Sequence, residues 1–186
     1  YQAINFFVSG QVPERLGNGH PNIVPYQVFK CRDGHLILAV ANDSQFRSFC
    51  RAVGKPEWAA DERFTVGSGR AVNRHALIEI IAELMLERSM QDWMTLLKAA
   101  NVPCGPINTL DKVYQDPQVQ HRGMKVELQH PAGPISLLAS PLRFSGTPVS
   151  YEVPPPLLGQ HTEAVMQELL GMDVQQVHAL REQGVI

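Results

Sequence analysis

The stretch YQVFKCRDGHLILAV, residues 26–40, decides the fold. Two runs of β-prone residues, 26–31 and 35–40, flank Arg32-Asp33-Gly34. An Asp-Gly pair between such runs is a strong signal for a short hairpin turn. We therefore predict an antiparallel β-hairpin at residues 26–40.

Helical patterns follow this hairpin. Ser44 can cap a helix that Gly54 and Pro56 end, and its apolar residues share one face: Phe46, Phe49, Cys50 and Val53. Residues 71–88 predict a longer helix, whose buried face would consist of Leu77, Ile80, Ile81, Leu84 and Met85. Its solvated face would carry Arg74, Glu79, Glu83 and Glu87.

A further helix begins at Ser89, where Asp92 takes the place of the usual Glu or Gln of a capping box. The sequence NVPCGP, residues 101–106, then excludes a helix because its prolines remove amide donors. Beyond it we predict a second strand pair at 124–128 and 135–138 and helices at 162–170 and 173–183. The pattern indicates an α+β (mixed α/β) protein.

Composition narrows the class of function. The chain has 16 Lys and Arg, 18 Asp and Glu and a pI near 6.4, so its charge gives no reason to expect nucleic acid or an anionic membrane surface. No apolar run approaches the roughly 18 residues that span a bilayer. Three cysteines cannot all pair, which favours a reducing cytoplasm. The sequence opens on Tyr1 without an initiator Met, and we expect a fragment of a longer protein.

The segment RLGNGHP, residues 15–21, is the best candidate for a binding site. Glycines let a backbone approach a ligand closely and offer amide donors to an oxyanion or thioester oxygen. The segment lacks the GxGxxG spacing and the lysine of nucleotide loops, and the residues alone favour an ordinary surface turn over a binding loop.

Other candidate chemistry is weak. Cys104 has no activating neighbour in the sequence. The seven histidines do not show the spacing of metal ligands, and there is no GxSxG serine site. The residues alone give no complete catalytic constellation, no metal site and no permanently bound cofactor.

Four segments, taken in order, resemble the family III CoA-transferases, the group of formyl-CoA transferase and the carnitine CoA-transferases. They are GNGHPNIVPY at residues 17–26, DERF at 61–64, VPCGPI at 102–107 and LLGQHT at 157–162. Asp116-Pro117-Gln118 adds to the match, which extends over practically the whole chain.

The resemblance implies an architecture. Members of that family fold as two interlocked subunits, each with a Rossmann-like large domain and a small domain, and this chain resembles the C-terminal half. Residues 1–24 would then be a linker with a glycine-rich loop, 25–100 the small domain, and 101–186 a linker followed by the C-terminal part of the large domain. The segment after Ile107 would expose apolar surface that normally covers absent elements.

The resemblance also implies a reaction. In the family, an aspartate attacks an acyl-CoA, and CoA reaches a free carboxylic acid through anhydride and aspartyl-CoA intermediates. That aspartate would lie upstream, so we assign no catalytic residue here and expect this chain alone to be inactive. The stretch Gly17, Asn18, Gly19 and His20 matches the loop that shields the intermediates. An α-methylacyl-CoA racemase of the same fold, or a non-catalytic module for dimerisation or ligand binding, are the alternatives.

Overall fold

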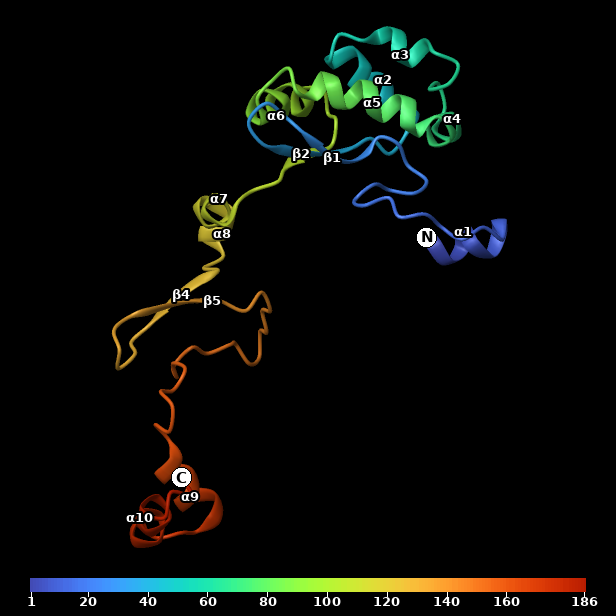
Figure 1. Ribbon diagram of the computed structural model, residues 1–186. Coiled ribbons are helices and arrows are strands. Elements are labelled where there is room, and N and C mark those ends of the chain that lie inside the picture. The colour runs from blue at the N-terminus through green and yellow to red at the C-terminus, as the bar shows by residue number, and fades with distance from the viewer. The chain divides into compact units, whose positions relative to one another are not determined.

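The computed structural model describes residues 1–186 as two compact units, Tyr1–Thr109 and Leu110–Ile186, which are described separately (Figure 1). Both combine helices with a small antiparallel sheet, as expected for a mixed α/β fold. The longest helix has 12 residues. None is both long enough and apolar enough to cross a lipid bilayer.

The first unit is built on a three-stranded antiparallel sheet with strand order β1-β2-β3. Strands β1 (Tyr26–Lys30) and β2 (His35–Ala39) form the predicted hairpin, with Tyr26 opposite Ala39. Strand β3 (Cys104–Pro106) pairs with the other edge of β2, where Leu38 lies opposite Cys104. The exclusion of a helix at 101–106 is confirmed, whereas the short strand β3 within this segment was not predicted.

The helices of this unit are α1 (Gln2–Ser9), α2 (Asp43–Ala52), α3 (Pro56–Ala60), α4 (Gly67–Val72), α5 (Arg74–Met85) and α6 (Met90–Ala99). Helices α2 to α6 lie over one face of the sheet (Figure 1). Their apolar stripes bury against the apolar face of the hairpin, and this burial supplies most of the stabilisation of such a layered unit.

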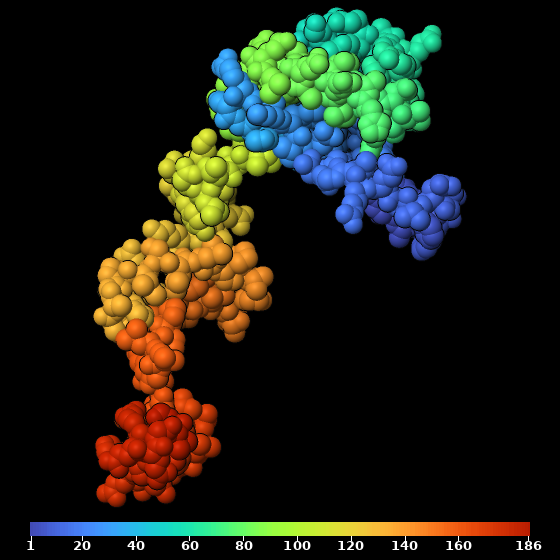
Figure 2. Space-filling model, viewed as in Figure 1, coloured from blue at the N-terminus to red at the C-terminus, as the bar shows by residue number.

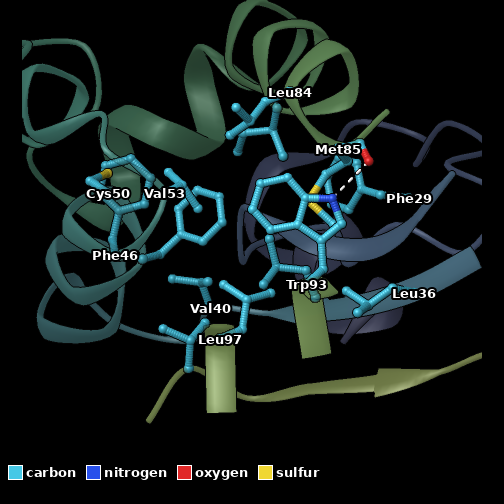
Figure 3. Packing of buried hydrophobic residues seen from close by; sticks show 14 of the residues in the cluster. Phe29, Leu36, Val40, Phe46, Cys50, Val53, Leu84, Met85, Trp93 and Leu97 are labelled. Carbon is cyan, nitrogen blue, oxygen red and sulfur yellow. Dashed lines mark hydrogen bonds between the residues drawn. The ribbon is translucent and has the colours of Figure 1, made fainter. Parts of the chain in front are cut away.

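Trp93 occupies the centre of this core and is surrounded by side chains from the sheet and the helices (Figure 3). Its indole Nε1 donates a hydrogen bond of 2.8 Å to the carbonyl oxygen of Met85, which joins α6 to the end of α5. The apolar faces predicted for the helices are confirmed, since the buried residues include Phe46, Phe49, Cys50, Val53, Leu77, Ile81, Leu84 and Met85.

Two helix boundaries differ from the prediction. Helix α2 is capped by Asn42, whose side chain accepts from the Gln45 amide, and not by Ser44. The helix predicted at 71–88 is divided at Asn73 into α4 and α5, and the Asn73 amide bonds back to the carbonyl of Gly69 at 2.9 Å. The cap at Ser89 is confirmed, because its side chain accepts from the Asp92 amide.

The second unit contains α7 (Leu110–Gln115), α8 (Pro117–His121), α9 (Thr162–Leu170) and α10 (Val174–Glu182), together with the antiparallel strands β4 (Lys125–Leu128) and β5 (Ile135–Leu138). The predicted strand pair and terminal helices are confirmed. Asp173 and Gln176 form a capping box at the start of α10, which fixes that helix boundary.

The second unit buries very little apolar surface. Only Ala139 and Val177 are buried hydrophobic residues in it. Many large apolar side chains remain exposed, including Leu110, Leu138, Leu142, Phe144, Leu158, Leu169 and Leu170. The predicted exposure of apolar surface after Ile107 is confirmed.

Candidate functional site

The glycine-rich segment runs between α1 and β1, and it lies at the surface of the first unit (Figure 2). It contains no helix or strand up to Tyr26, as its prolines predict. The loop is nevertheless fixed to the sheet, since the side chain of Asn18 accepts from the Val28 amide at 2.9 Å and the His20 amide donates to the Tyr26 carbonyl at 2.9 Å.

His20 is held in one orientation. Its Nδ1 accepts hydrogen bonds from the amides of Asn22 and Ile23, each at 3.1 Å. Its ring stacks on Tyr26, with centroids 5.4 Å apart and planes 10° apart. Because Nδ1 accepts, the neutral ring carries its proton on Nε2, which is a hydrogen-bond donor without an intramolecular partner in the chain.

A pocket of about 370 Å³ adjoins this histidine. The loop and the hairpin contribute Gly19, His20, Tyr26 and Gln27 to its wall, and helix α5 contributes Arg74, His75, Ile78 and Glu79. The wall thus combines one guanidinium, two imidazoles, one carboxylate and several apolar side chains, the mixture that binding pockets for small polar ligands present.

Two of the four predicted site residues contribute to this pocket. Gly19 and His20 line it, whereas Gly17 and Asn18 do not. Gly17 adopts a φ of +58°, a turn conformation that favours glycine, and Asn18 anchors the loop to β1. A side chain at Gly19 would be tight, because an added Cβ would lie 3.1 Å from the Leu16 carbonyl oxygen and 3.3 Å from Gln27 Oε1.

Arg74 is the site residue that the sequence missed. It was predicted to face solvent, but it is half-buried, and its Nη2 donates to the carbonyl oxygens of His20 at 2.8 Å and Pro21 at 3.0 Å. Its partners are 54 and 53 residues away in the chain, so no local pattern indicates the contact. The Glu79, Glu83 and Glu87 side chains are exposed, as predicted.

The cysteines carry no activated thiolate. Burial raises the pKa of Cys50 to about 12, although Arg70 partly opposes the change. Burial also raises the pKa of Cys31 and of Cys104. A thiol with a raised pKa is a poor nucleophile near neutral pH, so the structural interpretation of Cys104 is the one its surroundings favour.

Residues 1–162 match the sequence model described as CoA-transferase family III. The succinate–glutarate CoA-transferase of Agrobacterium fabrum is 42% identical over 169 residues, which cover 90% of this chain and 42% of that protein. The human succinyl-CoA:glutarate CoA-transferase is 36% identical over 185 residues, with 99% of this chain and 42% of the human protein covered. The chain thus spans less than half the length of these relatives.

A solved structure resembles the chain closely. The crystal structure of a CAIB/BAIF family protein from Brucella suis has a TM-score of 0.75 and 40% sequence identity, over 90% of this chain and 43% of that chain. The similarity in sequence to the relatives and the similarity in backbone to this structure therefore cover nearly the same part of the chain.

Proposed function

Because this chain belongs to CoA-transferase family III, we propose that it is part of an enzyme that moves CoA from an acyl-CoA to a free carboxylic acid. The feature of the structure that carries the proposal is the pocket at which the loop residues Gly19 and His20 meet Arg74 of helix α5. A non-catalytic ligand-binding module could use the same pocket without transfer of CoA, so an assay of transfer distinguishes the two interpretations.

The proposed substrates are short dicarboxylic acids and their CoA thioesters. The relatives at 42% and 36% identity are named for succinate and glutarate, which are both dicarboxylic acids. Dicarboxylates offer two anionic ends, and the Nε2–H donor of His20 at this pocket suits an anionic oxygen. No permanently bound cofactor takes part, because CoA enters and leaves as substrate and product.

The proposed chemistry is nucleophilic catalysis by an aspartate outside these 186 residues. Its carboxylate attacks the thioester carbonyl, the C–S bond breaks, and CoA leaves as a thiolate while an acyl-aspartyl anhydride remains. The thiolate then attacks the aspartyl carbonyl of the anhydride and releases the donor acid. The acceptor carboxylate repeats the sequence in reverse, which regenerates the aspartate and gives the new acyl-CoA.

In this scheme the loop of residues 16–25 contributes binding and shielding. Gly17, Asn18, Gly19 and His20 form its central part, in which Gly19 brings the backbone close to the pocket and the His20 Nε2–H donates to a substrate carboxylate or carbonyl oxygen. Exclusion of water protects the anhydride and the aspartyl thioester from hydrolysis. The fixed ring of His20 supports this role, since a donor that is already oriented loses little entropy on binding.

We propose the domain arrangement on the same basis. Residues 25–100 form the small domain, the linker that begins at 101 adds β3 to its sheet, and the segment from about 107 on completes a Rossmann-like large domain in an interlocked homodimer. The support is the apolar surface of the second unit, since exposed apolar patches of this kind mark surfaces that another element covers. We further propose that the protein acts in the cytoplasm.

The experiment is an assay of the full-length protein with succinyl-CoA and glutarate. Formation of glutaryl-CoA and succinate in equal amounts is expected, whereas epimerisation of a 2-methylacyl-CoA without exchange of CoA would contradict the proposal and favour a racemase. The purified 186-residue chain is expected to give no turnover. Transfer by that chain alone would place the nucleophile within it and overturn the assignment of the aspartate.

A further inference from the structure

Two arginines four residues apart bind the backbone of the glycine-rich loop. Arg70 lies near the end of α4, and its Nε donates to the Val24 carbonyl oxygen at 2.9 Å. Arg74 is the first residue of α5, and its Nη2 donates to the carbonyl oxygens of His20 and Pro21 at 2.8 and 3.0 Å. The junction between two helices thus holds both ends of the segment 20–24.

Besides the two arginines, a few hydrogen bonds hold this loop, and they include those of Asn18 with the Val28 amide, of the His20 amide with Tyr26 and of the Asn22 side chain with Asn5. It contains no helix or regular strand between Gly10 and Tyr26, and Pro13, Pro21 and Pro25 have no amide hydrogen to donate. Segments with few backbone hydrogen bonds open locally at low free-energy cost. Hydrogen bonds from a charged guanidinium are stronger than those between neutral groups, so the arginines contribute strongly to the conformation of the loop in this structure.

The two arginines differ in the rest of their surroundings. Arg70 is only 1% exposed, forms an ion pair with Asp43 and lies over the ring of Phe46, so it also belongs to the core. Arg74 is half-buried at the pocket wall, and none of the five ion pairs in the chain involves it. Its hydrogen bonds are the two to the loop carbonyls. Arg74 therefore stabilises the position of the loop, whereas Arg70 stabilises both the loop and the core of the first unit.

We propose that Arg74 is a positioning residue that latches the loop of residues 16–25 against the pocket and so sets the balance between CoA transfer and hydrolysis. This inference rests on the proposed function. Without the latch, water reaches the thioester or the anhydride, a C–O bond to water forms as the C–S or anhydride bond breaks, and the net reaction is acyl-CoA plus water giving free acid and CoA thiol. The aspartate is regenerated unchanged.

The test compares full-length wild-type protein with Arg74→Ala, Arg74→Lys and Arg47→Ala. Arg47 is the matched control because it is an exposed arginine on α2. Glutaryl-CoA formation measures transfer, and release of CoA thiol from succinyl-CoA without acceptor measures hydrolysis. Arg74→Ala should raise the ratio of hydrolysis to transfer by about tenfold, the effect expected for loss of a charged hydrogen bond. The ratio for Arg74→Lys should lie between those of the wild-type protein and Arg74→Ala, because lysine keeps the charge but not the fixed donor geometry.

Trypsin provides a readout that is independent of activity. Arg15 is exposed directly before this loop, so cleavage between Arg15 and Leu16 reports loop opening. Arg74→Ala should increase the rate of this cleavage severalfold over Arg47→Ala at an unchanged melting temperature.

The outcomes separate the two proposals. Wild-type protein without CoA transfer would overturn the proposed function. Active wild-type protein together with an Arg74→Ala variant of unchanged hydrolysis ratio and unchanged cleavage after Arg15 would overturn the latch alone. A variant that loses transfer only in proportion to a lower melting temperature would show that Arg74 is merely structural, and would likewise contradict the inference.

Discussion

Arg70 Nη2 donates to Oδ1 of Asp43 across 2.8 Å, although the arginine is almost completely buried and the Asp43 side chain is 42% exposed. The guanidinium also donates to the carbonyl oxygens of Val24 and Phe64, both at 2.9 Å. A buried cation is stable only when its donors are paired, and this one is paired with three different segments of the first unit.

Replacement of Arg70 by Ala should lower the free energy of unfolding by about 3 kcal/mol, because the carbonyl oxygens of Val24 and Phe64 lose their buried donor. Both tryptophans, Trp58 and Trp93, lie in the first unit, so tryptophan fluorescence during urea unfolding reports on it. Arg47→Ala is the control and should change stability by less than about 0.5 kcal/mol. Equal effects of the two substitutions would contradict the structural role of Arg70.

Substitution of Gly69 tests the packing of α4 against the backbone at Arg63. A Cβ added there would lie 2.8 Å from the Arg63 carbonyl oxygen, so Gly69→Ala forces a backbone shift. The cost of about 1 to 3 kcal/mol should exceed the gain of about 1 kcal/mol that Ala brings to a helix. Gly67→Ala is the control, because it lies in the same helix and its added Cβ meets atoms only at 3.6 Å or more. A more stable Gly69→Ala protein in the same urea titration would show that this contact is wrong.

The stability of the first unit should fall at alkaline pH. Burial raises the pKa of Cys50 to about 12 in the folded state, against about 8.5 for a thiol in an unfolded chain. The unfolded state therefore loses its proton first, and the stabilisation present below about pH 8.5 is progressively lost as the pH rises towards 12. Cys31 and Cys104, whose pKa values burial also raises, act in the same direction.

Cys50→Ala removes the largest of these contributions. Urea midpoints measured at pH 7 and pH 10 should differ less in this variant than in the wild-type protein, whatever the packing change does to the midpoint at pH 7. An identical decrease in both proteins would contradict the assignment of the alkaline effect to Cys50.

Two His20 variants distinguish the role of Nδ1 from that of Nε2. His20→Gln can place an amide donor near the position of Nε2, whereas His20→Asn places an acceptor near Nδ1, where the amides of Asn22 and Ile23 donate. If Nε2 contacts the substrate, Gln should retain more transfer than Asn, and Asn should raise the KM for the acceptor acid about tenfold in the full-length protein. Higher activity of the Asn variant would limit His20 to holding the loop.

Elements with a local sequence signal were predicted correctly from the sequence. The hairpin was found from the Asp33-Gly34 signal, although Gly34 does not adopt the positive φ of a two-residue hairpin turn. The apolar faces of α2 and α5 were found from their helical spacing. Strand β3 was missed because Pro103 and Pro106 oppose a strand locally, whereas the open edge of β2 provides partners for this segment. The break at Asn73 was missed as well. Its side-chain amide donates to the carbonyl oxygens of Gly69 and Arg63, and the contact with Arg63, ten residues away, leaves no mark in a local pattern.

The candidate site was predicted only in part. The glycines and His20 were found from the composition of the loop and the family resemblance. Arg74 was assigned to the solvated face because its spacing on α5 fits that face, and its contacts with His20 and Pro21 join segments more than 50 residues apart. Periodicity records which face of a helix is polar, but it does not reveal which loop packs there.

The measurement that tests the account most directly is transfer of CoA by the full-length protein, followed by mass spectrometry with succinyl-CoA and carboxyl-labelled glutarate. We predict one glutaryl-CoA for each succinate released, with little free CoA and a covalently modified aspartate that maps outside residues 1–186. Stoichiometric release of CoA thiol without glutaryl-CoA, or a modified aspartate within these 186 residues, would contradict the account.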